Sequence, residues 1–317
     1  MPSTNNGSGG SRRTIFTTHI AYSFYRLDAW APLGVYNWVM RALLMLAIAA
    51  AFGGSLQPAD SPPSAADIVR RCIELDQTNW MRMKDYTWIS RETTRHLDSG
   101  GHVKSTESEA WETIILFGRL SRKLVERNGQ ALSPDKQRKE QEKLDKITGK
   151  LERETPSERE RRLADYVKER EKDREFLREL PDAFEFRMEG EQKIDGRDTW
   201  AISARPKPWY QAKHGDAKAF AKIEGKIWID QNEFQWVRIE AKTIEKISAG
   251  LGLLAQLNPG ATLIFEQARI NDEIWLPKRF VVGGSGRLAL FKKLSEQQEI
   301  TWNDYRKFHV DSEIISR

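Results

Sequence analysis

From residue 84 to residue 310 most of the chain alternates apolar and polar residues with a period of two, and turn residues interrupt it about every ten residues. This pattern is typical of half-buried antiparallel strands in a meander. So many strands are expected to curl into a barrel-like shell, which gives an α+β fold with an antiparallel sheet. The predicted strands are Tyr86–Leu97, His102–Phe117, Leu120–Arg127, Ala183–Lys193, Asp198–Arg205, Ile223–Asp230, Phe234–Glu245, Ala261–Ile270, Ile274–Val282, Arg287–Leu290 and Glu299–Phe308.

Two regions have helical spacing instead. Ser64 and Asp67 form a capping box ahead of an apolar face, which predicts a helix packed on the sheet. That face consists of Ile68, Val69, Cys72, Ile73, Leu75 and Trp80. Residues 133–180 hold 15 basic and 14 acidic residues and predict two charged helices, the second opening with a capping box at Thr155 and Glu158. This insert is either a solvated cover on the sheet or a partner-binding arm.

The start of the chain has a different composition. An uninterrupted apolar run of eleven residues, 42–52, follows Arg41 and precedes Gly53–Ser55, the order of a secretory signal. Either Met40 is the real start or residues 1–39 are a dispensable extension. The alternative to a cleaved signal is that 35–56 remains as an uncleaved anchor. The predicted organisation is 1–56 extension and signal-like segment, 57–63 linker, 64–310 main domain with the insert 133–180, and 311–317 tail. We expect an exported, periplasmic protein.

Charge and cysteine content narrow the function. The net charge is +5, but residues 60–317 carry 47 basic and 45 acidic groups, a balance that does not favour nucleic-acid binding. Cys72 is the only cysteine, so an intramolecular disulfide is excluded.

Several strands place apolar residues on both faces, so something apolar is expected to cover each side. Either ordinary core packing around large tryptophans or an apolar ligand in a concave pocket accounts for this. The residues expected to line or gate such a lipid pocket are Trp200, Trp228, Trp236, Leu251, Leu253, Leu254 and Phe265. Three of these belong to the uncharged segment 247–257, which is either a buried helix or strand extension or a flap at the pocket.

The loop 206–215 combines Trp209 and Tyr210 with lysines. Amphipathic aromatics beside Lys suit a pocket rim or a membrane–water boundary, and they also occur in ordinary loops. We assign Trp209 and Tyr210 to the rim.

Candidate chemistry is sparse. The motifs HExxH and GxSxG and the phosphate-binding loop do not occur, and Gly283–Gly286 is predicted to be a turn between two strands rather than a phosphate cradle. We therefore expect no catalytic residues, no metal and no cofactor, with a hydrolase of unusual type as the remaining enzymatic alternative.

Three short stretches carry a family resemblance: residues 196–208, then 225–230 with 236–240, and 271–278. They resemble a strand that ends in a Pro-Lys turn, a strand with Leu or Trp followed by Ile-Asp, a strand ending in Glu, and a Trp-Leu-Pro edge. These are similar to the bacterial lipoprotein-carrier and receptor (LolA/LolB-like) superfamily, with its lipoprotein-sorting-protein-like branch as the best match. The charged insert and the long extension depart from the pattern.

The resemblance implies an unclosed β-barrel wrapped around helices, with an apolar cavity for acyl chains and no catalytic residues. The expected function is monomeric, non-catalytic carriage of lipid or lipoprotein acyl chains, with a membrane surface or an envelope protein as further partners. The alternative is an envelope interaction or stress-regulatory module that uses the insert, since the same fold also serves such a regulator.

Overall fold

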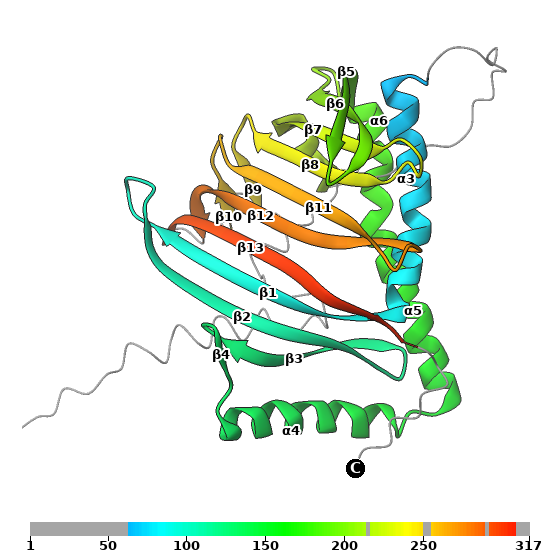
Figure 1. The fold of residues 1–317 in the computed structure, drawn as a ribbon, viewed down its shortest axis with the longest axis vertical. Helices are drawn as coiled ribbons and strands as arrows, with labels where there is room; N and C mark the ends of the chain where they lie inside the picture. The colour runs from blue at the N-terminus through cyan, green and yellow to red at the C-terminus, as the bar shows by residue number, and fades with distance from the viewer. Residues whose placement is uncertain (1–62, 214–215, 250–254, 289–291, 309–317) are drawn as a thin grey trace, which may run out of the picture.

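The computed structural model describes residues 63–213, 216–249, 255–288 and 292–308 (Figure 1). Its helices are α3 (Ala65–Arg82), α4 (Pro134–Leu151), α5 (Pro156–Glu175) and α6 (Leu180–Ala183), with 3₁₀ turns η1 (Met83–Asp85), η2 (Phe176–Glu179) and η3 (Asp216–Lys222). The signal-like segment lies outside the described residues, as do Leu251, Leu253 and Leu254. Among the described helices none is long and apolar enough to span a bilayer.

One antiparallel sheet holds all the described strands. They are β1 (Tyr86–Leu97), β2 (Val103–Leu116), β3 (Arg119–Arg127), β4 (Gln130–Ala131), β5 (Phe184–Ile194), β6 (Arg197–Pro206), β7 (Ile223–Asp230), β8 (Trp236–Thr243), β9 (Ile247–Ala249), β10 (Ala255–Leu257), β11 (Thr262–Ile270), β12 (Ile274–Leu288) and β13 (Lys292–Lys307). The fold class predicted from the sequence is thus confirmed: α+β, with a curved and unclosed sheet.

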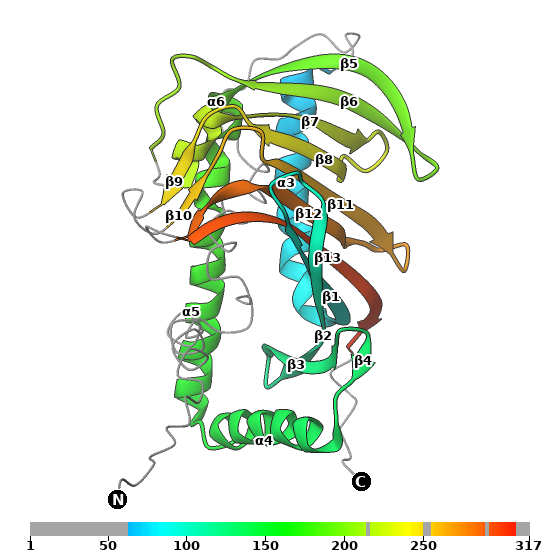
Figure 2. The same ribbon diagram turned by 90° about the vertical axis from the view of Figure 1, so that its left-hand side faces the viewer.

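The strand order explains why the sheet is open. It runs β4-β3-β2-β1-β13-β12-β11-β8-β7-β6-β5, with β9 and β10 attached beside β12. Two meanders, β1–β4 and β5–β13, are joined by the pairing of β1 with β13. The edges of this main path are β4 and β5, and the charged insert is the chain that connects them. Helix α4 lies along the β3–β4 end, and α5 leads back to α6 and β5 (Figures 1 and 2).

Helix α3 starts where the sequence predicts. The Ser64 hydroxyl accepts the N–H of Asp67 at 3.2 Å, and it donates to the Asp67 carboxylate at 2.6 Å. The helix crosses the strands and buries an apolar stripe against one face of the sheet, which we call the inner face (Figure 2). That stripe consists of Ala65, Ile68, Val69, Cys72 and Ile73. Leu75, assigned to the same face, is 38% exposed instead, because it lies at the margin of the stripe.

The main core lies between α3 and the inner face. Strand residues from β5 to β13 contribute to it, together with Leu180 and Ala183 of α6 and Phe220 of η3. A second, smaller core gathers where α3 ends and β1 begins, around Met83, Tyr86 and Trp88.

β12 corrects two sequence predictions. Gly283–Gly286 was predicted to be a turn and Arg287–Leu290 a separate strand, but β12 runs without a break to Leu288. The glycines serve close packing between strands: a Cβ on Gly284 would lie 2.5 Å from the Cβ of Ala261. Local sequence cannot separate this use of glycine from a turn.

Candidate functional site

The inner face beside α3 is the candidate binding surface, and a β-bulge decides its composition. Trp228 pairs with Arg238 whereas Ile229 pairs with Trp236, so Val237 is an extra residue in β8. Alternation along the strand assigns Trp236 and Ile239 to opposite faces, which is wrong, because the bulge turns both toward the main core. Trp236, which was expected on the opposite face, therefore adds to the apolar surface of the inner face.

The predicted pocket residues divide between three places. Trp236 and Phe265 are 1% and 5% exposed and belong to the main core, and Trp200 is half-buried at its margin. Trp228 lies on the outer face, since its neighbours Ile227 and Ile229 point inward. Its indole N–H donates to Gln192 Oε1 at 2.7 Å, and the Lys226 ammonium lies 5.2 Å from its ring centroid.

The margin of the core is aromatic. The rings of Trp200 and Phe234 are 5.0 Å apart, and the Arg71 guanidinium of α3 lies 4.1 Å from the Phe234 ring centroid. Trp200 and Phe234 are half-buried members of the main core, so apolar ring surface reaches solvent beside α3.

Trp236 adds an unsatisfied polar group to this interior. Its indole Nε1 is buried and has no hydrogen-bond partner within the described part of the chain. An unpaired buried donor costs about 1–3 kcal/mol, so an oxygen that reached it would be held firmly. The neighbouring Cys72 thiol has its pKa raised by burial and stays protonated, which makes it a packing group.

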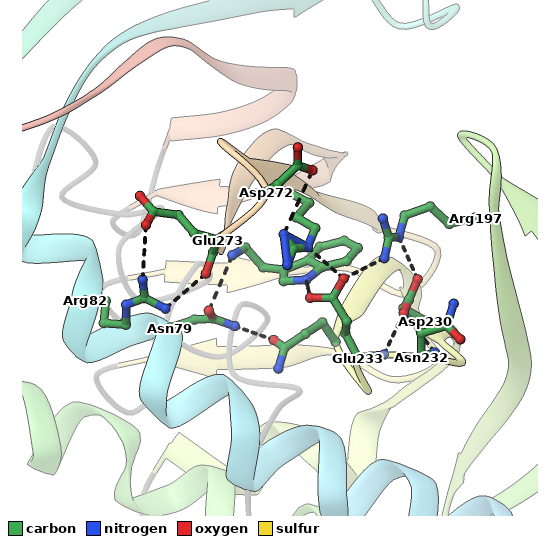
Figure 3. A network of polar contacts seen from close by, with 11 residues as sticks. Asn79, Arg82, Arg197, Asp230, Asn232, Glu233, Asp272 and Glu273 are labelled. Carbon is green, nitrogen blue, oxygen red and sulfur yellow. Dashed lines mark hydrogen bonds and ion pairs between the residues drawn. The ribbon is translucent and has the colours of Figure 1, made fainter.

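A polar network fixes the carboxyl end of α3 to the turns of the sheet (Figure 3). Asn79 Nδ2 donates to Gln235 Oε1 at 2.5 Å, and the backbone N–H of Trp275 donates to Asn79 Oδ1 at 3.4 Å. Arg82 donates to the carbonyl of Glu273 at 3.0 Å. These three contacts reach the β7–β8 turn and the β11–β12 turn, so this end of the helix is held by hydrogen bonds as well as by packing.

Glu233 is the hub of the adjoining ion pairs. Its carboxylate accepts from Arg197 and Arg269, both at 2.7 Å, and from the Trp275 indole at 3.0 Å (Figure 3). Asp230, which has no exposed side-chain surface, pairs with Arg197 and raises the pKa of that guanidinium. The sequence did not point to this network, because its members lie far apart along the chain.

The outer face carries a groove of about 480 Å³ across β6, β7, β8 and β11. Four of its charged side chains form two ion pairs, Lys226 with Glu189 at 2.7 Å and Lys242 with Glu224 at 2.9 Å, and Glu240 is bound by Arg238. Most of the charge in this groove is therefore already paired.

The rim residues occupy the loop after β6. Trp209 is 74% exposed, whereas Tyr210 packs against the main core and donates to Glu179 Oε2 at 2.6 Å. Burial, together with this carboxylate, raises the pKa of Tyr210, which keeps the phenol protonated. The loop therefore pairs an anchored aromatic with an exposed one.

Groups suited to chemistry remain scattered. The described residues contain no cluster of three or more His, Cys, Asp or Glu side chains that could hold a metal ion. Burial raises the pKa of Glu92, but its carboxylate is bound by Arg122 in a structural pair. The described residues therefore form surfaces suited to binding. Among them we find no group of side chains arranged for acid–base catalysis.

Comparison with solved structures shows that the chain is similar to LolA-superfamily structures. A putative outer membrane lipoprotein-sorting protein domain from Vibrio parahaemolyticus shares 12% identity, with 76% of this chain and 93% of that chain covered and a TM-score of 0.32. A LolA superfamily protein from Nitrosomonas europaea shares 10% identity over 81% of this chain and 99% of its own, with a TM-score of 0.30.

A chain of the Pseudomonas aeruginosa MucA/MucB complex also matches, with 9% identity, 78% and 99% coverage and a TM-score of 0.23. No protein-family model matches the sequence, and no curated protein does. The superfamily that the sequence resembles is thus also found among the structural matches, which concern the fold alone.

Proposed function

We propose that the protein is a non-catalytic carrier of lipid or lipoprotein acyl chains that works in the periplasm. The observation that carries this proposal is the half-buried aromatic margin of Trp200 and Phe234 beside α3, where the apolar inner face of the sheet reaches solvent. An acyl chain that enters there would extend the main core. Each methylene that is buried contributes about 0.8 kcal/mol to binding. An acyl chain can therefore bind even if only part of its surface is covered by the protein.

The polar end of such a ligand has two matching groups. Arg71 stands over Phe234 at the margin and suits a carboxylate or phosphate. The unpaired indole N–H of Trp236 suits an ester or amide carbonyl that follows the chain inward. A ligand with an acyl chain and an oxygen-rich head satisfies both.

The test uses the purified full chain and a fluorescent fatty acid, with native mass spectrometry of the protein from an envelope extract as a second measurement. Trp200→Ala is expected to weaken uptake of the fluorescent fatty acid at least about tenfold, because one aromatic wall of the margin is lost. A wild-type protein that neither binds the probe nor carries lipid adducts would contradict the proposal.

Trp111→Ala is the matched control. Trp111 is also a half-buried tryptophan; the Arg122 guanidinium lies 4.6 Å from its ring centroid, and it lies on β2, away from α3. Equal loss of binding in both variants would indicate a general loss of stability, and thermal unfolding of each variant separates that case.

The helical insert supports a second candidate, binding of an envelope protein. Val167 of α5 is 37% exposed, and the first half of α5 contacts the β2–β3 turn, where Arg162 donates to the Phe117 carbonyl at 3.1 Å. Deletion of 133–180 is a poor test because it removes the buried Glu179 and Leu180. Val167→Arg instead keeps the core and is expected to block partner capture while acyl-chain uptake persists.

A further inference from the structure

The loop between β6 and η3 holds an apolar side chain out in solvent on a rigid support. Trp209 is 74% exposed, the highest value among the large apolar residues described. On either side of it the backbone is fixed: the Lys207 N–H donates to the Ala183 carbonyl at 2.8 Å, and the Lys213 N–H donates to Glu179 Oε2 at 2.8 Å. A largely exposed tryptophan is thus carried by a loop whose backbone is hydrogen-bonded to the core.

Tyr210 also attaches this loop to the core. Its hydroxyl binds the Glu179 carboxylate, a residue only 2% exposed, and its ring lies 6.5 Å from that of Phe220. Tyr210 is thus directed into the protein, whereas its neighbour Trp209 is largely exposed.

The chain around Trp209 is rich in basic residues. Segment 205–222 contains five basic residues and one acidic residue, whereas residues 60–317 as a whole are close to neutral. Lys213 pairs with Asp182 at 3.4 Å in an exposed contact that leaves 73% of the lysine side chain in solvent, and Lys218 of η3 is exposed as well. Lysine ammonium groups beside an interfacial tryptophan complement a surface of anionic headgroups over acyl chains.

We propose that Trp209, with Lys213 and Lys218, forms a docking site for an anionic phospholipid membrane surface. The indole would sit at headgroup depth, where an apolar ring with one N–H donor is favoured, and the lysines would contact the phosphates. The loop projects beyond α6, at the upper left of Figure 2, so it can reach a flat surface. This inference does not depend on acyl-chain carriage, because it concerns a different surface of the protein.

The chain offers a selective reporter. Its single cysteine, Cys72, is fully buried, so a cysteine introduced at an exposed position can be labelled alone. Gln211→Cys, carrying an environment-sensitive fluorophore, reports contact of this loop with a membrane even if another part of the full chain also binds vesicles. The probes are vesicles of phosphatidylcholine, alone or mixed with phosphatidylglycerol.

We expect the label at 211 to shift to shorter wavelength with the anionic vesicles and not with phosphatidylcholine alone. Adding Trp209→Ala should abolish the shift. Lys213→Gln and Lys218→Gln should each weaken binding about fivefold, since each lysine near an anionic surface contributes about 1 kcal/mol.

The same label on Val103→Cys is the control. Val103 is 54% exposed beside Lys104, at the tip of the β1–β2 hairpin (Figure 1). An equal shift at 103 and 211, no shift at 211 with anionic vesicles, or a shift that survives Trp209→Ala would each overturn the proposal. A fatty-acid uptake that fails while the shift at 211 persists would reject only the carrier function.

Discussion

The Nε of Arg197 lies 2.6 Å from Oδ2 of Asp230, a carboxylate with no solvent exposure. The same guanidinium also stands 4.8 Å from the ring centroid of Trp275 and binds Glu233. It therefore joins the β5–β6 turn, the β7–β8 turn and β12 at the end of the sheet where α3 finishes (Figure 3).

Arg197→Met is expected to lower the free energy of unfolding by about 3 kcal/mol, because it leaves a buried carboxylate without its counter-charge while the stem over Trp275 remains. Urea unfolding followed by circular dichroism measures the loss. Lys193→Met is the control: its 3.3 Å pair with Asp198 is largely exposed on both sides, so a change within about 0.5 kcal/mol is expected. Similar losses in the two variants would contradict the structural role of the Arg197 pair.

The start of α3 gives a second prediction. Ser64→Ala removes the hydroxyl that accepts the Asp67 N–H and should cost about 1 kcal/mol. Ser133 precedes α4 in the same way but makes no side-chain capping bond, so Ser133→Ala should change stability little. Thermal unfolding of the two variants compares an N-cap that makes a side-chain hydrogen bond with one that makes none. An equal fall in unfolding temperature in both variants would be inconsistent with the Ser64 contact.

Two adjacent glycines of β12 give a third. A Cβ at Gly284 would lie 2.5 Å from Ala261 Cβ, whereas one at Gly283 would come no closer than 3.7 Å to a neighbouring side chain. Gly284→Ala should destabilise the protein by about 1–3 kcal/mol through overpacking. Gly283→Ala should be neutral or slightly stabilising, since it reduces the entropy of the unfolded chain. Equal tolerance at both sites would show that β11 and β12 are not packed as described.

The pH dependence of Glu92 gives a fourth. Burial raises the pKa of Glu92 in the folded protein above its ordinary value of 4.5. Between these two pKa values the folded state binds more protons than the unfolded state, so this group's contribution to stability falls as pH rises through that window. The stability of wild type relative to Glu92→Gln is therefore expected to decrease from about pH 4.5 upward and then level off, as measured by urea unfolding at a series of pH values.

Glu126 is the control of opposite sign. The hydrogen bond from Arg91 lowers the pKa of Glu126, so its stabilising contribution is present above its ordinary pKa of 4.5 and is lost as the pH falls below it. The stability of wild type relative to Glu126→Gln should then rise with pH in the acid range. If stability rose with pH in both comparisons, the pKa of Glu92 would not be raised by burial.

Much of the fold was predictable because its signals are local. The two capping boxes, the hairpin around Asp98–Gly101 and the charged helices between β4 and β5 depend on residues a few positions apart, and the structure confirms them. The bulge at Val237 was not predictable in this way, because register is set by the partner strand. One extra residue moved Trp236 to the other face of the sheet.

The polar network at the end of α3 was missed for a related reason. Asn79, Arg197 and Glu233 are separated by many residues, and each taken alone is an ordinary helix or turn residue. The attachment of the Trp209 loop likewise depends on the hydrogen bond between Tyr210 and Glu179, a contact that spans 31 residues. The topology of the fold brings the residues of such surfaces together. Composition and spacing show which residues are present, but not which of them will be in contact.

The adjacency of β1 and β13 has a consequence for the order of the chain. If the polypeptide were reconnected beyond β13 into α3 and cut between α4 and α5, the eleven strands of the main path would follow one another in sequence as they do in space. Such a circular permutant would keep every strand pairing, because the cut falls in the 152–155 connection outside the sheet. The two meanders are therefore one continuous series of strands, and within the described residues the chain enters it at β1 and leaves it at the neighbouring strand β13.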